Sequence, residues 1–421
     1  MAYDVIIVGA GAAGLMTAIQ TAQGSLRVLL LEGQEKAGAK ILMSGGTRCN
    51  VTNKAVSEKD FNSEQIIYVR NILRSFSNAD TIRFFKDLGV ELVLEPTGKY
   101  FPSTHSGKTI LEALSRKIDS LNVTLLCGHK VKAVSFADNE FTVQGDHFHY
   151  HGKSVVLTTG GLSYPATGSD GTGFRLAQSF GHPMIETTPA LTPLTTQDND
   201  FKLLSGITLE VQLTLVVDGK RHFFCRDSFL FTHFGFSGPA ALDISRHYLR
   251  AKGQKQIMAN FIPEHSETSL QEYLRQAGQK NPCKTLRGVL IGLMPQRLAD
   301  VILKKTGIEA TLPMNQLDRA SRQRLIAGCV CYPLDVTGSL GYSKAEVTAG
   351  GMDWAEINPK TLESKLEPGL FFAGEILDVD GRIGGFNFQW AWASGQAAAQ
   401  GIIRKNSGTS RKDSLHEQKD H

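Results

Sequence analysis

The chain has 421 residues, of which 41% are hydrophobic and 20% charged, with a formal net charge of +4. This length can bury a large core and favours two or three domains. So small a net charge gives no argument for a nucleic-acid-binding protein. No apolar run approaches the ~20 residues of a membrane span, and nothing resembles a signal peptide. We therefore expect no membrane partner and a cytoplasmic location.

Cysteine and histidine spacing gives no metal motif. The six cysteines form no CxxC pair, and Cys329-x-Cys331 is their closest approach. Reduced thiols are therefore favoured over a disulfide or a metal site. His147, His149 and His151 recur at every second residue, which is typical of one solvated face of a strand. No metal site is predicted.

The first 32 residues predict a strand, a glycine turn, a helix and a second strand. An apolar run over 5–8 leads into Gly9-x-Gly11-x-x-Gly14, and a helical pattern continues to residue 22. A second apolar run over 28–31 ends at Glu32. This combination is typical of a dinucleotide-binding βαβ unit.

Each glycine of such a turn has its own physical role. Gly9 allows the tight turn, Gly11 lets backbone N–H groups approach a pyrophosphate, and Gly14 lets the helix lie close to the strand. The helix N-terminus then faces the phosphate charges. Glu32, at the end of the second strand, is placed to accept hydrogen bonds from ribose hydroxyls.

A second glycine- and hydroxyl-rich loop follows at 34–53. Lys40 and Arg48 can carry positive charge toward phosphate or substrate, and Ser44, Asn50 and Asn53 supply hydrogen-bonding groups. A polar turn would use the same residue types. The density of such residues beside a nucleotide fold favours a ligand-binding loop.

The central part of the chain predicts helices over 64–89 and 109–121 and strands from 123 to 151. The run 155–161 is a buried strand that breaks at Thr159-Gly160-Gly161, which lets backbone pass close to a nucleotide. From about Pro189 the segments become short and β-rich. We expect an insertion at 190–347, with an antiparallel sheet or β-barrel (190–263 and 308–347) carrying a helical subdomain (264–307).

The C-terminal part returns to the nucleotide fold. A buried strand over 369–375 ends at Gly374 and Glu375, and a glycine-rich loop leads to a small-residue helix over 390–403. FAD is extended and needs such a second contact near its flavin half, and the N–H groups of a helix there would stabilise negative charge on reduction. The cofactor domain would thus be 1–189 with 348–404. The polar segment 405–421 is predicted to be disordered.

Taken together, these stretches resemble the BaiN/RdsA family of FAD-dependent oxidoreductases. The resemblance rests on Gly9-Ala-Gly-Ala-Ala-Gly14, Lys40-Ile-Leu-Met-Ser-Gly-Gly-Thr-Arg-Cys-Asn-Val-Thr-Asn53, Leu230-Phe-Thr-His-Phe-Gly-Phe-Ser-Gly-Pro239, Val347-Thr-Ala-Gly-Gly351, Gly374-Glu-Ile-Leu-Asp378 and Gly384-Gly-Phe-Asn-Phe-Gln-Trp-Ala391. It implies an α/β protein with a Rossmann-like FAD-binding domain and an inserted β-barrel domain with a helical subdomain. Thr47 and Phe386 depart from the glycine and tyrosine of many members.

The glycine pattern and the resemblance together predict a set of FAD contacts. Val131 is included because its backbone is expected to contact the adenine. The set is Gly9, Gly11, Ala13, Gly14, Glu32, Lys40, Ser44, Gly45, Arg48, Cys49, Asn50, Val131, Thr159, Gly160, Gly374, Glu375, Asp380, Gly385, Phe386 and Asn387.

The resemblance leaves the substrate open. Members are associated with reduction of enone rings in bile acids, with amine oxidation and with dihydrouridine formation in ribosomal RNA. We expect a reductase of activated C=C bonds acting on a small molecule, with NAD(P)H as a transient donor because no second GxGxxG is present. Arg48, Cys49 and His233 are the catalytic candidates.

Two alternatives remain open: an amine oxidase that uses O2, and an enzyme that modifies ribosomal RNA. The second would use a basic face of the insertion, although such residues more often form a solvated surface. Its candidates are Arg246, Arg250, Lys252, Lys255, Lys304, Lys305, Arg319, Arg322 and Arg324.

Overall fold

The computed structural model describes residues 3–417. It divides the chain into two compact units: unit 1 comprises the residues up to Thr188 and those from Glu346 on, and unit 2 is Pro189–Ala345. Each unit has its own hydrophobic core. The insertion predicted from the sequence, 190–347, differs from unit 2 by one residue at its start and two at its end.

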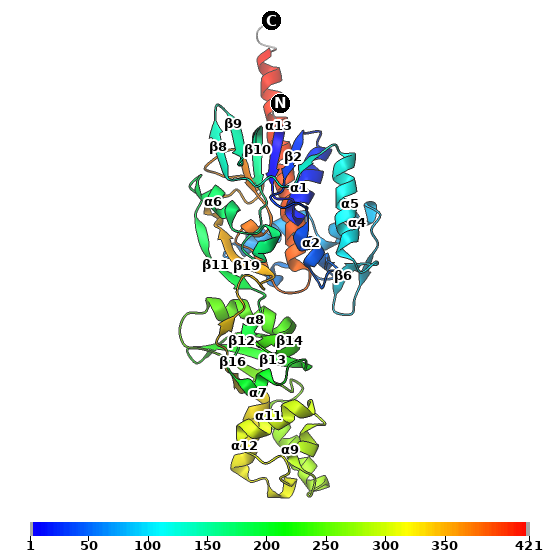
Figure 1. Cartoon of the computed structure of the whole chain (residues 1–421), viewed down its shortest axis with the longest axis vertical. Coiled ribbons are helices and arrows are strands. Elements are labelled where there is room, and N and C mark those ends of the chain that lie inside the picture. Colours follow the sequence, from blue (N-terminus) through cyan, green and yellow to red (C-terminus); the bar gives the residue numbers. More distant parts are fainter. Residues whose placement is uncertain (1–2, 418–421) are drawn as a thin grey trace. The chain divides into compact units, whose positions relative to one another are not determined.

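The central sheet of unit 1 has seven strands (Figure 1). Four of its pairings are parallel and two are antiparallel. The order is β7 (Thr124–Leu126), β2 (Val28–Leu31), β1 (Tyr3–Val8), β10 (His149–Leu157), β9 (Glu140–Gln144) and β8 (Ala133–Ala137), and β20 (Leu370–Phe372) pairs with β10. The parallel half is the Rossmann-like sheet that the sequence predicts.

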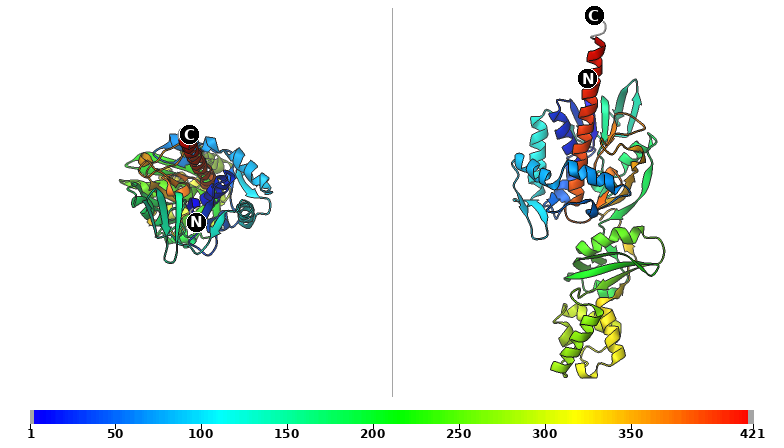
Figure 2. Two further views of the ribbon diagram at one scale, coloured as in Figure 1. Left: turned by 90° about the horizontal axis from the view of Figure 1, so that it is seen from above. Right: turned by 180° about the vertical axis from the view of Figure 1, so that it is seen from behind.

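Two helices from opposite ends of the chain pack together in unit 1. They are α1 (Ala12–Gln23) and α13 (Phe386–Glu417), and Figure 2 shows α13 from behind as it runs through this unit. Small residues permit the approach: Thr17 donates to the Gly395 carbonyl over 3.3 Å, and a Cβ at Gly395 would lie 2.7 Å from the Ala13 carbonyl oxygen. The C-terminal helix therefore completes the N-terminal nucleotide fold.

Shorter elements surround this sheet. The helices are α2 (Ala39–Met43), α3 (Ile66–Ser75), α4 (Asn78–Asp87), α5 (Gly107–Ser120) and α6 (Thr172–Gln178). Three small sheets pair β3 (Thr52–Asn53) and β5 (Leu92–Leu94) with β6 (Lys99–Pro102), β4 (Phe61–Asn62) with β21 (Asp380–Gly381), and β11 (Met184–Ala190) with β19 (Val347–Met352).

Unit 2 contains an antiparallel seven-stranded sheet. Its order is β17 (Tyr332–Leu334), β16 (Lys255–Asn260), β13 (Thr208–Val217), β14 (Lys220–Thr232), β15 (Gly235–Ser237), β12 (Leu194–Thr195) and β18 (Gly338–Ser339). Within the described residues β17 and β18 do not pair, so the predicted barrel is an open sheet. Its outer strands have only two or three residues, which is too short to close the ladder.

The helices of unit 2 extend beyond the predicted helical subdomain. They are α7 (Asn199–Lys202), α8 (Gly238–Arg250), α9 (Glu267–Lys280), α10 (Leu286–Leu290), α11 (Gln296–Thr306) and α12 (Arg319–Val330). The predicted helical subdomain, 264–307, contains α9, α10 and α11. Helix α8 was not predicted; it begins at Gly238-Pro239, where the proline stands in the first turn that tolerates it.

The sequence predicts disorder for 405–421, whereas α13 is described as far as Glu417. No proline interrupts residues 405–417, so nothing forces the helix to stop there. The last residues of the predicted tail, 418–421, lie outside the described part of the chain.

Within residues 3–417, no helix is long and apolar enough to cross a membrane. The same residues contain no cluster of three or more histidine, cysteine or acidic side chains that could hold a metal ion. All six cysteines are free thiols. His149 and His151 are exposed on β10, as expected for a solvated strand face.

We expect unit 2 to lose stability in mild acid through His247 of α8. Its ring stacks on Phe223 with centroids 3.7 Å apart, and burial, aided by the nearby Arg246 and His222, lowers its pKa to about 3. Because the unfolded residue titrates near ~6.5, stability present above that pH is lost as the pH falls toward 3.

At pH 5 this loss should be about 2 kcal/mol relative to pH 8. The His247→Phe variant keeps a ring against Phe223 but cannot titrate, so its stability should change less between the two pH values. Urea unfolding of both proteins at pH 8 and pH 5 measures the difference. Identical pH dependence would contradict the assignment.

Candidate functional site

The glycine turn after β1 leaves space beside the N-terminus of α1. Gly9 has φ +103°, and a Cβ there would lie 2.7 Å from the Thr158 carbonyl oxygen. A Cβ at Gly14 would lie 1.9 Å from the Gly9 oxygen, so the helix needs glycine to approach the strand. Gly11 differs, because a Cβ there would meet no heavy atom within 4 Å. The open side at Gly11 is where backbone N–H groups can receive a phosphate.

Glu32 lies at the end of β2 and is buried, with 9% of its surface exposed. Its two carboxylate oxygens accept hydrogen bonds from the backbone N–H groups of Ala10 and Gln34, each over 2.9 Å. Burial raises the pKa of this carboxyl group, whereas the backbone donors oppose that shift. Each oxygen keeps a second lone pair, so the carboxylate can still accept from ribose hydroxyls.

The two distant glycine-rich turns lie side by side. A Cβ at Gly374, where φ is +82°, would lie 2.8 Å from the Ala13 Cβ. Helix α13 holds this corner, because the Ser394 hydroxyl accepts from the Gly374 N–H over 2.9 Å and the Trp390 indole donates to the Gly374 carbonyl over 3.0 Å. Segments more than 350 residues apart therefore form one wall of the candidate site.

Lys40 and Glu375 form an ion pair within a polar network. The Lys40 ammonium donates to Glu375 over 2.5 Å and to the Ser163 hydroxyl over 2.6 Å. The other Glu375 oxygen accepts from the Ser163 hydroxyl over 2.6 Å and from the Thr348 N–H over 3.0 Å. Four segments are thereby joined at one point.

Ser163 and Thr348 were absent from the predicted site set. Thr348 belongs to the Val347-Thr-Ala-Gly-Gly351 stretch, and Ser163 follows the Gly160-Gly161 strand end, so both lay near residues already noted. A hydroxyl two residues after a glycine break is too common a turn feature to identify a site by itself.

The loop before α13 is held by three asparagines. Asn50 accepts from the Gly385 N–H over 2.9 Å, and Asn53 donates to the Gly384 carbonyl over 2.9 Å. Asn387, a predicted cofactor contact, uses its amide on both the N–H and the carbonyl of Gly381, each over 2.8 Å. Its side chain therefore shapes the loop.

Asp380 and Phe386 are both buried beneath the same loop. Asp380 accepts from the Asn62 amide over 3.1 Å. The Phe386 ring lies edge-on to Phe61 and carries the Arg382 guanidinium 4.3 Å from its centroid. Because both side chains are buried, any contact that Asp380 and Phe386 make with FAD would have to come from their backbone atoms.

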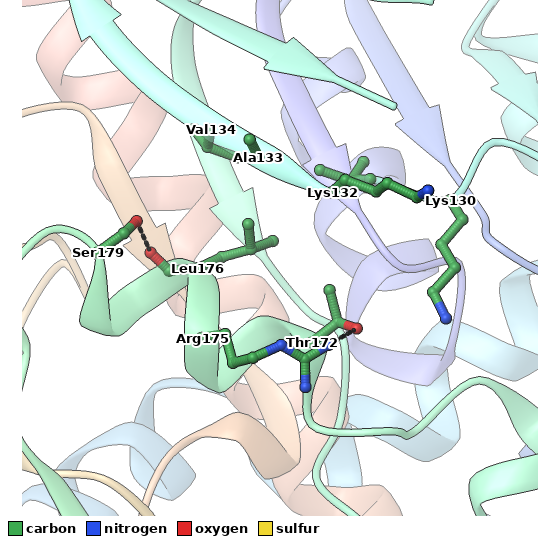
Figure 3. Close-up of a pocket in the computed structure, with 9 residues that line it drawn as sticks. Lys130, Lys132, Ala133, Val134, Thr172, Arg175, Leu176 and Ser179 are labelled. Carbon is green, nitrogen blue, oxygen red and sulfur yellow. Dashed lines mark hydrogen bonds between the residues drawn. The ribbon is translucent and has the colours of Figure 1, made fainter. Parts of the chain in front are cut away.

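Val131 lines a groove with a cavity volume of about 560 Å³ between the segment 130–134 and α6 (Figure 3). Val134 and Leu176 give it apolar surface, and Lys130 and Arg175 add two positively charged side chains to its lining. Lys130 pairs with Asp170 over 2.7 Å. The groove suits a flat apolar group that carries polar edges.

The strand end at Thr159-Gly160 packs against α6, because a Cβ at Gly173 would lie 1.8 Å from the Thr159 hydroxyl oxygen. The Thr159 hydroxyl is buried without a hydrogen-bond partner among the described residues. An orphaned buried hydroxyl is unusual and calls for an explanation, such as a bound group. The open space at Gly11 is compatible with the phosphates of an elongated nucleotide.

The three catalytic candidates have different surroundings. Arg48 pairs with Glu95 over 2.6 Å and lies 4.1 Å from the Phe101 ring centroid. Cys49 is fully buried, and burial raises the pKa of its thiol to about 12, so it is not a thiolate nucleophile at neutral pH. His233 lies in unit 2, in the turn between β14 and β15.

The loop that carries Ser44 and Gly45 is strained. Gly45 and Gly46 have φ of +56° and +66°, and Thr47 has φ +70°. A β-branched residue in this region is an outlier, and the left-handed conformation costs about 1–2 kcal/mol. Such strain often occurs at ligand-binding loops.

We expect Thr47→Gly to stabilise the protein by about 1 kcal/mol, because glycine adopts this backbone without a Cβ penalty. Thr47 is exposed, so little packing is lost. Thr47→Ala keeps the Cβ and is the matched control, with no comparable gain expected. Denaturant unfolding of the three proteins compares their stabilities, and a lower stability for Thr47→Gly would contradict the strain.

The basic residues of unit 2 are largely engaged by neighbours. Lys304 donates to Asp200 and Lys305 to Asp198, each over 2.6 Å. Lys255 donates to the Tyr248 carbonyl over 2.8 Å, and Arg324 to the Thr306 carbonyl over 3.1 Å. The two ion pairs of Lys304 and Lys305 reduce the free positive charge of the proposed basic face.

Comparison with known proteins agrees with this geometry. Residues 3–401 match the family model described as the HI0933-like protein Rossmann domain. The chain is 34% identical over 406 residues to the ribosomal RNA dihydrouridine synthase of Haemophilus influenzae, covering 95% of this chain and 98% of that protein. It is 32% identical over 408 residues to the Escherichia coli protein of the same name, with coverages of 96% and 99%.

A third relative has a different named activity. The 3-dehydro-bile acid delta(4,6)-reductase of Clostridium scindens is 32% identical over 409 residues, covering 95% of this chain and 98% of that protein.

The family match over nearly the whole chain and the paired glycine turns lead to one conclusion. The chain belongs to the HI0933-like Rossmann family, which includes the BaiN and RdsA proteins, and is an FAD-dependent flavoprotein oxidoreductase.

Proposed function

We propose that this enzyme reduces a C=C bond conjugated to a carbonyl group, with NAD(P)H as the electron donor. Its relatives are named for a bile-acid reductase and for dihydrouridine synthases. Dihydrouridine is uridine whose ring C=C bond next to a carbonyl carries two further hydrogens. The two named activities thus share one reaction type, and this shared chemistry supports the proposal.

The structural observation that best supports FAD binding is the contact between the two glycine turns, at Ala13 and Gly374. The N–H groups at Gly11 and the N-terminus of α1 would hold the pyrophosphate, and Glu32 the ribose. The groove at Val131 would take the adenine, with the backbone of that residue as its polar partner. Lys40 and Glu375 would lie toward the ribityl chain.

The flavin end would lie against the loop that opens α13. The N–H groups at the N-terminus of α13 carry roughly half a positive charge, which favours negative charge on the adjacent edge of the flavin. FAD, when bound, supplies the hydride chemistry. The protein's own part is to orient the cofactor, to hold this charge and to provide a proton to the second carbon.

Two substrate classes fit this reaction type. A small enone is our leading candidate, because Lys304 and Lys305 of unit 2 form ion pairs with Asp200 and Asp198 and are less available to a nucleic acid. A uridine of ribosomal RNA is the second candidate, which the 34% identical relative favours. Steep salt dependence of binding to ribosomal RNA fragments would favour the second.

Anaerobic reduction tests the proposal. We expect the purified protein to be yellow, to bleach with NADH or NADPH, and to be reoxidised by an enone or by uridine in ribosomal RNA. Reoxidation by O2 alone, together with peroxide release from an amine and no need for NAD(P)H, would instead establish an amine oxidase. A colourless protein that takes up no FAD would overturn the proposal entirely.

We also propose a cytoplasmic location. The observation in its support is that all six cysteines are free thiols, as is usual in a reducing compartment.

A further inference from the structure

The groove between α6 and the segment 130–134 (Figure 3) adjoins Glu32 on both of its walls. On one wall, Lys130 packs on the residue after Glu32, because a Cβ at Gly33 would lie 3.5 Å from the Lys130 Cα. On the other wall, the loop before α6 reaches the carboxylate itself, because a Cβ at Gly168 would lie 3.6 Å from a Glu32 oxygen. A base attached to a ribose at Glu32 would therefore enter this groove.

The two walls are joined by a charged contact of the protein itself. The Lys130 ammonium donates to one oxygen of Asp170 over 2.7 Å. The other Asp170 oxygen accepts from the backbone N–H of Thr172, in the first turn of α6, over 3.0 Å. Asp170 thus ties the segment 130–134 to the start of the helix, and this contact sets the spacing of the walls at one end of the groove.

Arg175 differs from the other cations that line the groove. Both lining lysines form ion pairs with aspartates. The Arg175 guanidinium donates to the Thr172 hydroxyl over 2.8 Å, and it forms no ion pair with the acidic residues of the described range 3–417. Figure 3 shows its side chain lying along the first turn of α6 toward Thr172. Most of its N–H groups therefore remain available to a ligand.

The chemistry of this lining suits a flat heteroaromatic base. A guanidinium group is planar and weakly hydrated, and it packs well on aromatic faces. Val134 and Leu176 supply apolar surface beside it. A purine offers a flat face to the first group and apolar contact area to the other two. An isolated anion would need the lysines, whose charge is already matched by aspartates.

We propose that Arg175 is a specificity-determining residue that recognises the adenine of FAD by packing its guanidinium against the purine ring. This inference rests on the proposed function, which places the adenine in this groove. Arg175 is not among the candidates that the sequence suggested, because an exposed arginine on a helix more often belongs to a solvated surface.

Titration of the apoprotein with FAD, FMN and ADP tests this role without turnover. Arg175→Met should bind FAD and ADP about 10-fold more weakly, in the range expected for loss of a cation–π contact. FMN lacks the adenosine half, so its affinity should equal that of the wild type and shows that the fold is intact. Arg175→Lys keeps the charge but not the plane and should recover little of the loss. Arg83→Met is the matched control, because Arg83 is an exposed arginine of α4 that donates to Asp80 three residues earlier.

Three results would overturn the proposal. Wild-type affinity of Arg175→Met for FAD would show that the residue does not touch the cofactor. Full recovery by Arg175→Lys would indicate a point charge on a phosphate, and equal weakening of FMN and FAD would place the effect on their common half. If the wild type takes up no FAD, the proposed function fails, whereas the ADP titration still decides whether Arg175 recognises a purine.

Discussion

Gly11→Val is expected to abolish FAD binding while leaving the protein folded. Gly11 has φ −80° and ψ −169°, an extended conformation that valine favours, and a Cβ there meets no heavy atom within 4 Å. The apolar side chain would instead fill the space that a pyrophosphate needs beside the first N–H groups of α1. Hydrogen bonds to a charged group contribute about 1.5–3 kcal/mol each, so we expect at least ~100-fold weaker binding.

FAD content and titration of the apoprotein with FAD measure this effect, and thermal unfolding reports the fold. Gly278→Val is the matched control, because Gly278 lies in α9 of unit 2 and its Cβ would only touch Met314 at 3.8 Å. It should bind FAD like the wild type. A yellow Gly11→Val protein with full FAD content would show that the turn does not hold the pyrophosphate.

Glu375→Ala is expected to destabilise the apoprotein by about 2–3 kcal/mol. The substitution removes the partner of Lys40 and the acceptor for both Ser163 and Thr348. Removing one partner of a fully buried ion pair costs about 3–5 kcal/mol. The side chains of Lys40 and Glu375 keep 25% and 17% exposure, which lets water replace part of the interaction.

Two comparisons show whether the charge or the hydrogen bonds matter. Glu375→Gln keeps an acceptor for the Thr348 N–H and loses only the charge, so its cost should be smaller. Glu272→Ala removes an exposed i,i+3 partner of Arg275 and should leave the stability nearly unchanged. Urea unfolding of the apoproteins gives all three values. Equal, small losses for Glu375→Ala and Glu272→Ala would contradict a structural role for the network.

The network also explains how a glycine-rich framework acquires a defined polar site. Lys40, Ser163, Thr348 and Glu375 come from four separate segments, and their hydrogen bonds satisfy polar groups that are largely shielded from solvent. A satisfied network of this kind holds one arrangement, whereas a partly satisfied one is costly.

Much of the cofactor site could be predicted because its signals are local. The strand, the turn at Gly9 and Gly14, and Glu32 at the end of β2 follow from period, turn chemistry and a short connection. The C-terminal turn at Gly374 has the same local character. Each such stretch carries its own conformational requirement, so the amino acids at a few positions suffice to indicate it.

The remaining features depend on contacts between distant segments. Burial of Cys49 removes a nucleophile that its loop position had suggested, and the amide of Asn387 is used within its own loop. The pairing of Lys40 with Glu375 spans 335 residues, and the Thr348 hydroxyl accepts hydrogen bonds from Leu162 and Ser163, more than 180 residues earlier.

The sequence by itself thus determined the nucleotide turn, because that turn needs backbone conformations that only certain residues permit, and the resemblance of its motifs indicated the family and the cofactor. Only the tertiary structure decided which polar side chains meet and which are buried or already paired. The physical reason is that burial and pairing are properties of neighbours, and neighbours from distant segments leave no local pattern in the chain.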